Sequence, residues 1–142
     1  MWPFNRTYDT ATRVSADQLR QSFAVYAPEQ TWPLDNEYLL WSATDAQHFV
    51  WRYGIPDRSY RAELDDCDDA ALDTLAAWRA GARKDGLPRH PAYGVLWIKR
   101  HGSAQTHMTN YWCVRGNIFL YDGRFGEFSS MTNVEKILGR LG

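Results

Sequence analysis

The spacing of apolar residues changes near the middle of this chain, and that change limits the folds available to it. Before residue 90, apolar side chains recur mainly at helical spacing. After residue 90, runs rich in aromatic and β-branched residues favour strands. Helices followed by antiparallel strands are typical of the α+β class. We therefore predict an α+β fold in which N-terminal helices pack on an antiparallel sheet.

Capping residues predict where three helices begin and end. Ser15, with a glutamine three residues later, has the form of a capping box, and Ser42 begins a second helix. The third and longest helix is expected over roughly 66–84, with Gly86 as its stop. Residues 28–37 contain two prolines and several polar groups, so we expect a loop there.

The second half of the chain predicts a small sheet. Strands are expected over 93–98, 106–114 and 117–121. The Arg-Gly pair at 115–116 is a turn signal between the last two strands. A short final helix is expected over 133–138, with an asparagine as its cap.

Composition excludes several classes of protein. A chain of 142 residues is expected to form a single domain, 1–142. Its net charge of -1 gives no electrostatic footprint for nucleic acid. Two cysteines are too few for a disulfide scaffold, and no apolar run has the length of a membrane span. The first residues lack the features of a signal peptide, so a cytoplasmic location is expected.

One thiol, Cys67, lies among carboxylates at the start of the predicted third helix. The neighbouring acidic residues are Asp65, Asp66, Asp68 and Asp69. Helix starts stabilise thiolates, which makes Cys67 a candidate nucleophile. A lone cysteine at such a position is more often an inert buried residue, and the aspartates also suit a capped, solvated helix start. Cys113 lies inside a predicted strand, where we expect it to fill the core.

Two polar residues, His107 and Asp122, are expected on the paired strands. If residues 115–116 form a two-residue turn, Val114 faces Asn117. His107 and Asp122 then lie on the same face, where the carboxylate is able to orient the imidazole. A three-residue loop would place them on opposite faces. The other histidines, at positions 48, 90 and 101, are expected on the surface.

Three short motifs in this order resemble a known family. They are Cys-Asp-Asp-Ala-Ala at 67–71, His-Met-Thr-Asn at 107–110 and Tyr-Asp-Gly at 121–123. The sequence resembles the papain-like C-terminal domain of the fungal agglutinin and its bacterial and phage relatives, over roughly residues 38–127. It resembles the transglutaminase-like cysteine peptidases nearly as well. The resemblance implies a papain-like or transglutaminase-like core with Cys67 as nucleophile, His107 as base and Asp122 as its orienting partner.

The resemblance also implies a calcium-dependent protease. Asp66, Asp68 and Asp69 are the candidate metal ligands. Nearby carboxylates oppose formation of a thiolate by like-charge repulsion, and calcium binds clustered carboxylate oxygens readily. The carboxylates match no EF-hand pattern.

These observations lead to two functional hypotheses. The first is a cysteine hydrolase, a thiol protease or amidase that cleaves a peptide or protein substrate through Cys67, His107 and Asp122. The alternative is a papain-like fold with altered catalysis, acting as a binding or inhibitory module, with a phage as a candidate source. A substrate-sized groove between helix and sheet would favour the hydrolase. A closed groove with large exposed aromatic residues would favour the binding module.

Overall fold

The computed structural model describes residues 7–54, 67–115, 117–122 and 126–142. Its elements are, in chain order, β1 (Arg13–Ser15), α1 (Ala16–Ser22), the 3-10 turn η2 (Ala24–Tyr26), β2 (Gln30–Trp32), β3 (Glu37–Leu39), α2 (Ala43–Tyr53), α3 (Cys67–Lys84), β4 (Tyr93–Arg100), β5 (Thr106–Val114), β6 (Asn117–Asp122), β7 (Glu127–Ser130) and β8 (Val134–Leu141). Helices dominate the first half and strands the second, which confirms the predicted α+β class.

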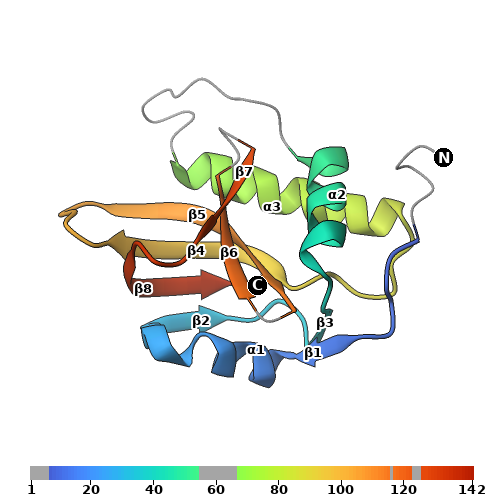
Figure 1. Ribbon diagram of the computed structural model, residues 1–142, viewed down its shortest axis with the longest axis horizontal. Helices are drawn as coiled ribbons and strands as arrows, with labels where there is room; N and C mark the ends of the chain where they lie inside the picture. The colour runs from blue at the N-terminus through green and yellow to red at the C-terminus, as the bar shows by residue number, and fades with distance from the viewer. Residues whose placement is uncertain (1–6, 55–66, 116, 123–125) are drawn as a thin grey trace.

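Six of the strands in the described residues form one twisted sheet in the order β2-β8-β4-β5-β6-β7. All neighbours are antiparallel except β2 and β8, which are parallel. The sheet is therefore mixed. The prediction of a purely antiparallel sheet is wrong, because β2 pairs with β8 in parallel. Helices α2 and α3 lie on one side of this sheet and α1 on the other (Figure 1). Strands β1 and β3 form a separate antiparallel pair.

The hairpin of β5 and β6 has the predicted register. Val114 pairs with Asn117, so the connection is the two-residue turn. Further along the same ladder Asn110 pairs with Tyr121. Because side chains alternate between the faces of a strand, this register gives Asp122 the same parity as His107.

Helix ends follow the capping signals in the sequence. The Ser15 hydroxyl accepts the Gln18 N–H at 3.0 Å, while the Gln18 side chain accepts the Ser15 N–H at 2.9 Å, so the capping box is complete. The Ser42 hydroxyl accepts the Asp45 N–H at 3.3 Å at the start of α2. At the start of α1, side chains thus satisfy two backbone N–H groups, and at the start of α2 a side chain satisfies one.

Helix α3 ends in a Schellman motif at Gly86. Gly86 has a φ of 68°, a left-handed conformation that glycine adopts without strain. The Leu87 N–H donates to the Ala82 carbonyl and the Gly86 N–H to the Arg83 carbonyl, each at 3.1 Å. This motif confirms Gly86 as the predicted stop and turns the chain back along the end of the helix.

Several predictions based on local sequence are wrong. A helix was predicted over 133–138, but residues 134–138 belong to β8, which lies inside the sheet between β2 and β4. Its buried residues Val134 and Ile137 are three positions apart, a spacing that also fits a helix. The predicted loop at 28–37 contains β2 and the start of β3, whose pairing partners are distant in sequence.

Aromatic side chains fill the core between the sheet and helices α2 and α3. The Trp112 ring on β5 lies 5.5 Å from that of Trp78 on α3 and 5.7 Å from that of Phe49 on α2. Tyr93 and Trp41 complete the surroundings of Trp112, with centroids at 5.0 and 6.0 Å. A second apolar cluster packs α1 against the opposite face of the sheet. Cys113 belongs to that cluster, as predicted.

We predict that Gly81→Ala destabilises the protein because α2 and α3 pack closely at this glycine. A Cβ atom at Gly81 would lie 2.5 Å from the Tyr53 ring. Overpacking of this kind typically costs about 1–3 kcal/mol, which outweighs the gain of about 1 kcal/mol in helix propensity. Thermal unfolding measures the change. Ala80→Gly, at the exposed neighbouring position, should lose only about 1 kcal/mol. A stabilised Gly81→Ala variant would contradict the packing.

Candidate functional site

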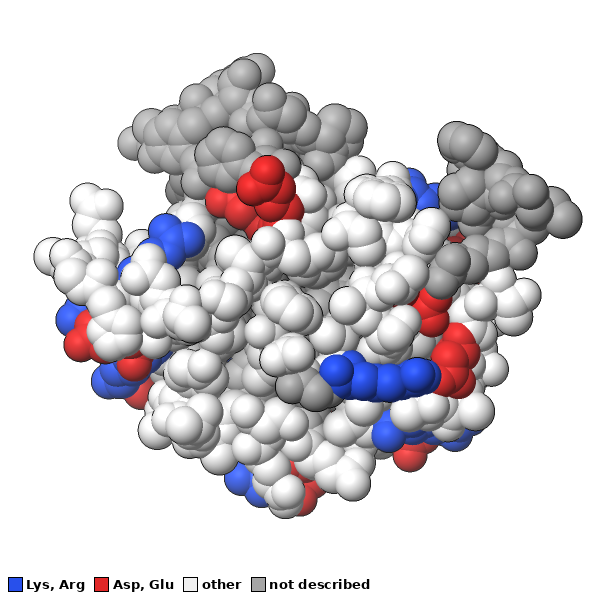
Figure 2. All heavy atoms as spheres, in the orientation of Figure 1, with Lys and Arg blue, Asp and Glu red and all other residues white. Residues whose placement is uncertain are grey.

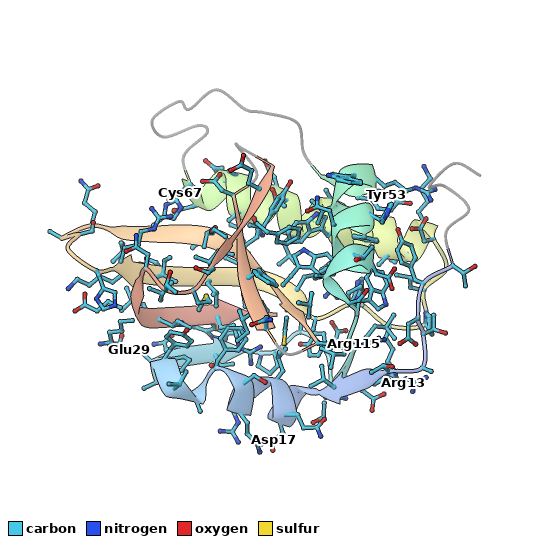
Figure 3. The ribbon with its side chains drawn as sticks, in the orientation of Figure 1. Arg13, Asp17, Glu29, Tyr53, Cys67 and Arg115 are labelled. Carbon is cyan, nitrogen blue, oxygen red and sulfur yellow. The ribbon has the colours of Figure 1, made fainter. Side chains whose placement is uncertain are left out.

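Cys67 is the first residue of α3 and is half-buried. Figure 3 shows its position at one end of the helix, with Tyr53 of α2 toward the other end. The Cys67 thiol donates to a carboxylate oxygen of Asp68 at 3.4 Å. The predicted position of the thiol, in the first turn of a long helix, is therefore confirmed.

The three residues predicted to act together line one cavity. Cys67, His107 and Asp122 contribute to a space of about 10 Å³ next to the region where β5 and β6 pair. A cavity of this volume holds about one water molecule. The chain thus brings the three residues to one place, but the cavity they line is too small for a substrate. Hydrogen bonding between His107 and Asp122 stays a prediction.

Asn110 braces the helix against the sheet beside this cavity. It is 2% exposed, and its side-chain amide donates to the carbonyls of Ala71 at 2.9 Å and Gly94 at 3.2 Å. Asn110 is three residues from His107 on the same strand, so the two side chains lie on opposite faces, and Asn110 has this structural role. Its contact with α3 was not predictable from local sequence, because Ala71 lies in a different element.

The described residues do not complete the predicted calcium site. Asp66 lies outside the described residues. Asp68 is exposed and Asp69 half-buried in the first turn of α3, and successive helical side chains diverge by about 100°. Among the described residues, no group of three or more His, Cys, Asp or Glu is placed to hold a metal ion.

A larger apolar groove lies on the α3 side of the sheet. We call it the tryptophan groove; it is lined by Trp32, Leu72, Val95, Trp97, Met108, Gly139, Arg140 and Leu141 and has a volume of about 350 Å³. Trp32 and Trp97 are 49% and 45% exposed, and Leu72 on α3 is 45% exposed. Isolated exposed apolar residues are ordinary, but three around one groove indicate a binding surface.

Pairing of distant strands builds this groove. Trp97 on β4 pairs with Gly139 on β8, and Trp32 on β2 pairs with Leu141. A Cβ atom at Gly139 would lie 3.0 Å from the Trp32 ring, so the missing side chain leaves room for the indole. No local sequence pattern singles out Trp32 or Gly139 for this role. Two other tryptophans lie outside the groove: Trp41 is in the core and Trp51 is on α2.

On the face seen in Figure 2, acidic and basic side chains are scattered and uncharged side chains occupy the centre. In the described part of the chain, no helix combines the length and apolar character needed to cross a membrane.

Two solved structures share this fold. One is described as a complex of PSL1a with E64; it has a TM-score of 0.75 and 16% identity, and the match covers 94% of this chain and 51% of that one. The other is the lectin of Polyporus squamosus bound to a human-type influenza-binding epitope, Neu5Ac linked α2-6 to Gal linked β1-4 to GlcNAc; it has a TM-score of 0.66 and 17% identity over 94% and 50% of the two chains. This chain thus spans about half the length of each. No family model and no curated protein matches it.

These comparisons confirm part of the resemblance and contradict the leading functional prediction. A fungal lectin does share the fold, but the papain-like core is not shown. Both neighbours are lectin complexes, and one is bound to a glycan. The prediction of a cysteine hydrolase or thiol protease is therefore wrong, and the alternative of a binding module fits the comparisons better.

We predict that iodoacetamide modifies Cys67 faster than Cys113 in the folded protein near neutral pH. Burial raises the pKa of the Cys113 thiol to about 11, and this side chain is only 8% exposed. Cys67 is more accessible and lies at a helix start. Mass spectrometry of the modified peptides measures both rates. Unfolding in urea should make the rates similar, and equal slow rates in the folded protein would contradict the prediction.

Proposed function

We propose that this chain is a carbohydrate-binding module built on a papain-like core. In this proposal it corresponds to about half of each of the longer solved chains. One observation carries the proposal: the cavity at Cys67 holds about one water molecule, whereas Trp32 and Trp97 stand exposed around a groove of about 350 Å³. A small space at the thiol and a larger open aromatic surface favour a binding module over a hydrolase.

The chemistry of the tryptophan groove suits a sugar ring. One face of a pyranose consists mainly of C–H groups, while its hydroxyls point outward around the ring. An indole supplies a large, flat apolar surface that such a face is able to cover. The exposed rings of Trp32 and Trp97 give the groove this character, and its volume lies within the range of small-molecule sites. A glycan is therefore a better ligand for it than the peptide expected from the motifs.

Met108 links the groove to the Cys67 cavity, because it lines both. His107 and Asp122 line the Cys67 cavity but not the groove. We propose that the indoles supply the contact area for a sugar ring, while His107 and Asp122 pair with each other at the neighbouring cavity. The cytoplasmic location and the phage origin stay predictions.

Calcium binding near Asp68 and Asp69 remains part of the proposal. If the ion binds there, millimolar calcium chloride should raise the melting temperature, because it relieves repulsion between carboxylates that folding brings together. Magnesium chloride at the same concentration controls for ionic strength. A double Asp68→Asn, Asp69→Asn variant should lose the response to calcium. No calcium-specific shift in the unaltered protein would remove calcium from the proposal.

Replacement of either groove tryptophan by alanine should weaken glycan binding at least tenfold, because the stacking surface is lost. Titration calorimetry with the neutral disaccharide Galβ1-4GlcNAc and its sialylated form measures the change. Trp51→Ala is the matched control, since Trp51 is 68% exposed on α2 and lies outside the groove. Unchanged affinity in Trp32→Ala and Trp97→Ala, or a loss in Trp51→Ala of the same size, would place binding elsewhere.

A further inference from the structure

A second cavity, of about 380 Å³, lies at the other end of α3 from Cys67. We call it the arginine cavity. The Schellman motif forms one wall with Ala82, Arg83 and Leu87, and the segment 34–37, which ends at the first residue of β3, forms another. His90 completes the lining from the chain that leads into β4. No described residue belongs to both this cavity and the tryptophan groove.

The carboxylates of the arginine cavity are already held by ion pairs. Asp35 accepts a hydrogen bond from Arg79 at 3.0 Å. Glu37 lies between two guanidinium groups, 3.2 Å from Arg13 and 3.0 Å from Arg89. These pairs fix the positions of the carboxylates, but each retains lone pairs that are able to accept further hydrogen bonds. The positive charges of three arginines thus already neutralise the negative charges of these two carboxylates.

Arg83 adds a fourth guanidinium, and it lines the cavity directly. Among the described residues, the ion pairs found do not include Arg83. The C-terminal end of a helix favours a cation, which stabilises Arg83 in the last turn of α3. Positive charge therefore exceeds negative charge around this cavity, although the net charge of the whole chain is -1.

The same positive charges help to lower the pKa of His90. Burial, followed by the charges of Arg79 and Arg83, lowers the pKa of this half-buried imidazole below 6.5, while Asp35 acts in the opposite direction. Its Nδ1 lies 2.8 Å from the Tyr93 hydroxyl. Burial strongly raises the pKa of Tyr93, so the phenol keeps its proton. When that hydroxyl donates to Nδ1, the ring proton is on Nε2, and His90 is a neutral donor.

From this arrangement we propose that the arginine cavity binds a small polyhydroxylated carboxylic acid, such as a uronic acid. Its carboxylate pairs with Arg83, since a guanidinium matches a carboxylate through two parallel hydrogen bonds. Its hydroxyls donate to the free lone pairs of Asp35 and Glu37. A bare inorganic anion would leave most of the 380 Å³ unfilled, and an apolar acid would leave these carboxylates without new partners.

Titration calorimetry of the intact chain with D-glucuronate, D-glucose and inorganic phosphate, at one ionic strength, tests the charge and shape of the ligand. D-glucuronate should bind at least tenfold more tightly than either of the others. If D-glucose binds with the same affinity as D-glucuronate, the negative charge of the ligand does not contribute to binding. Phosphate of equal affinity would show an unselective anion site. Either result, or no binding of D-glucuronate at millimolar concentration, overturns the proposal.

Substitutions locate the site. Arg83→Gln should weaken D-glucuronate binding at least tenfold, and Arg83→Lys should weaken it less, because a lysine keeps the charge but not the paired geometry. Arg100→Gln, at the other end of β4, is the matched control and should bind normally. Unchanged binding in Arg83→Gln overturns the proposal. Trp97→Ala should bind D-glucuronate normally, so failure of the tryptophan groove and failure of this cavity are distinguishable.

Discussion

The contact between Trp78 of α3 and Trp112 of β5 organises the structure. Both rings are fully buried, and the aromatic residues around Trp112 come from the sheet, from α2 and from the segment before it. Aromatic pairs with this spacing stabilise a core beyond the area they bury. They hold α3 across the sheet, and Asn110 adds two hydrogen bonds, one to Ala71 of the helix and one to Gly94 of β4. Each surface proposed to bind a ligand depends on that placement, because α3 contributes to each.

Local signals predicted the elements whose ends are set by neighbouring residues. The capping box at Ser15, the glycine stop at Gly86 and the two-residue turn after Val114 all act within a few positions of the chain, and all are confirmed. β8 was missed because its identity depends on pairing with β2 and β4, which are distant in sequence. The apolar positions 134, 137 and 138 are compatible with a helix until those partners are known.

The motifs predicted which residues meet, but not the space around them. The order of Cys67, His107 and Asp122 indicated that they converge, and they line one cavity. Residue types in a motif carry no information about the volume beside them, and a fold by itself does not imply a function. The tryptophan groove was missed for a related reason: Trp32 and Gly139 are brought together by a parallel pairing that no local pattern reports.

The two proposed sites differ in chemistry because α3 presents different residues along its length. Leu72, one turn after the helix start, contributes apolar surface to the groove, while Arg83 in the last turn contributes charge to the cavity. With a rise of 1.5 Å per residue, about 16 Å of helix separates them. The part of α3 between them is held by buried Trp78 and by close packing of Gly81 on Tyr53. A well-packed helix resists small displacements. Binding of a ligand at one site therefore does not change the ligand affinity of the other site. The two sites should therefore bind their ligands independently.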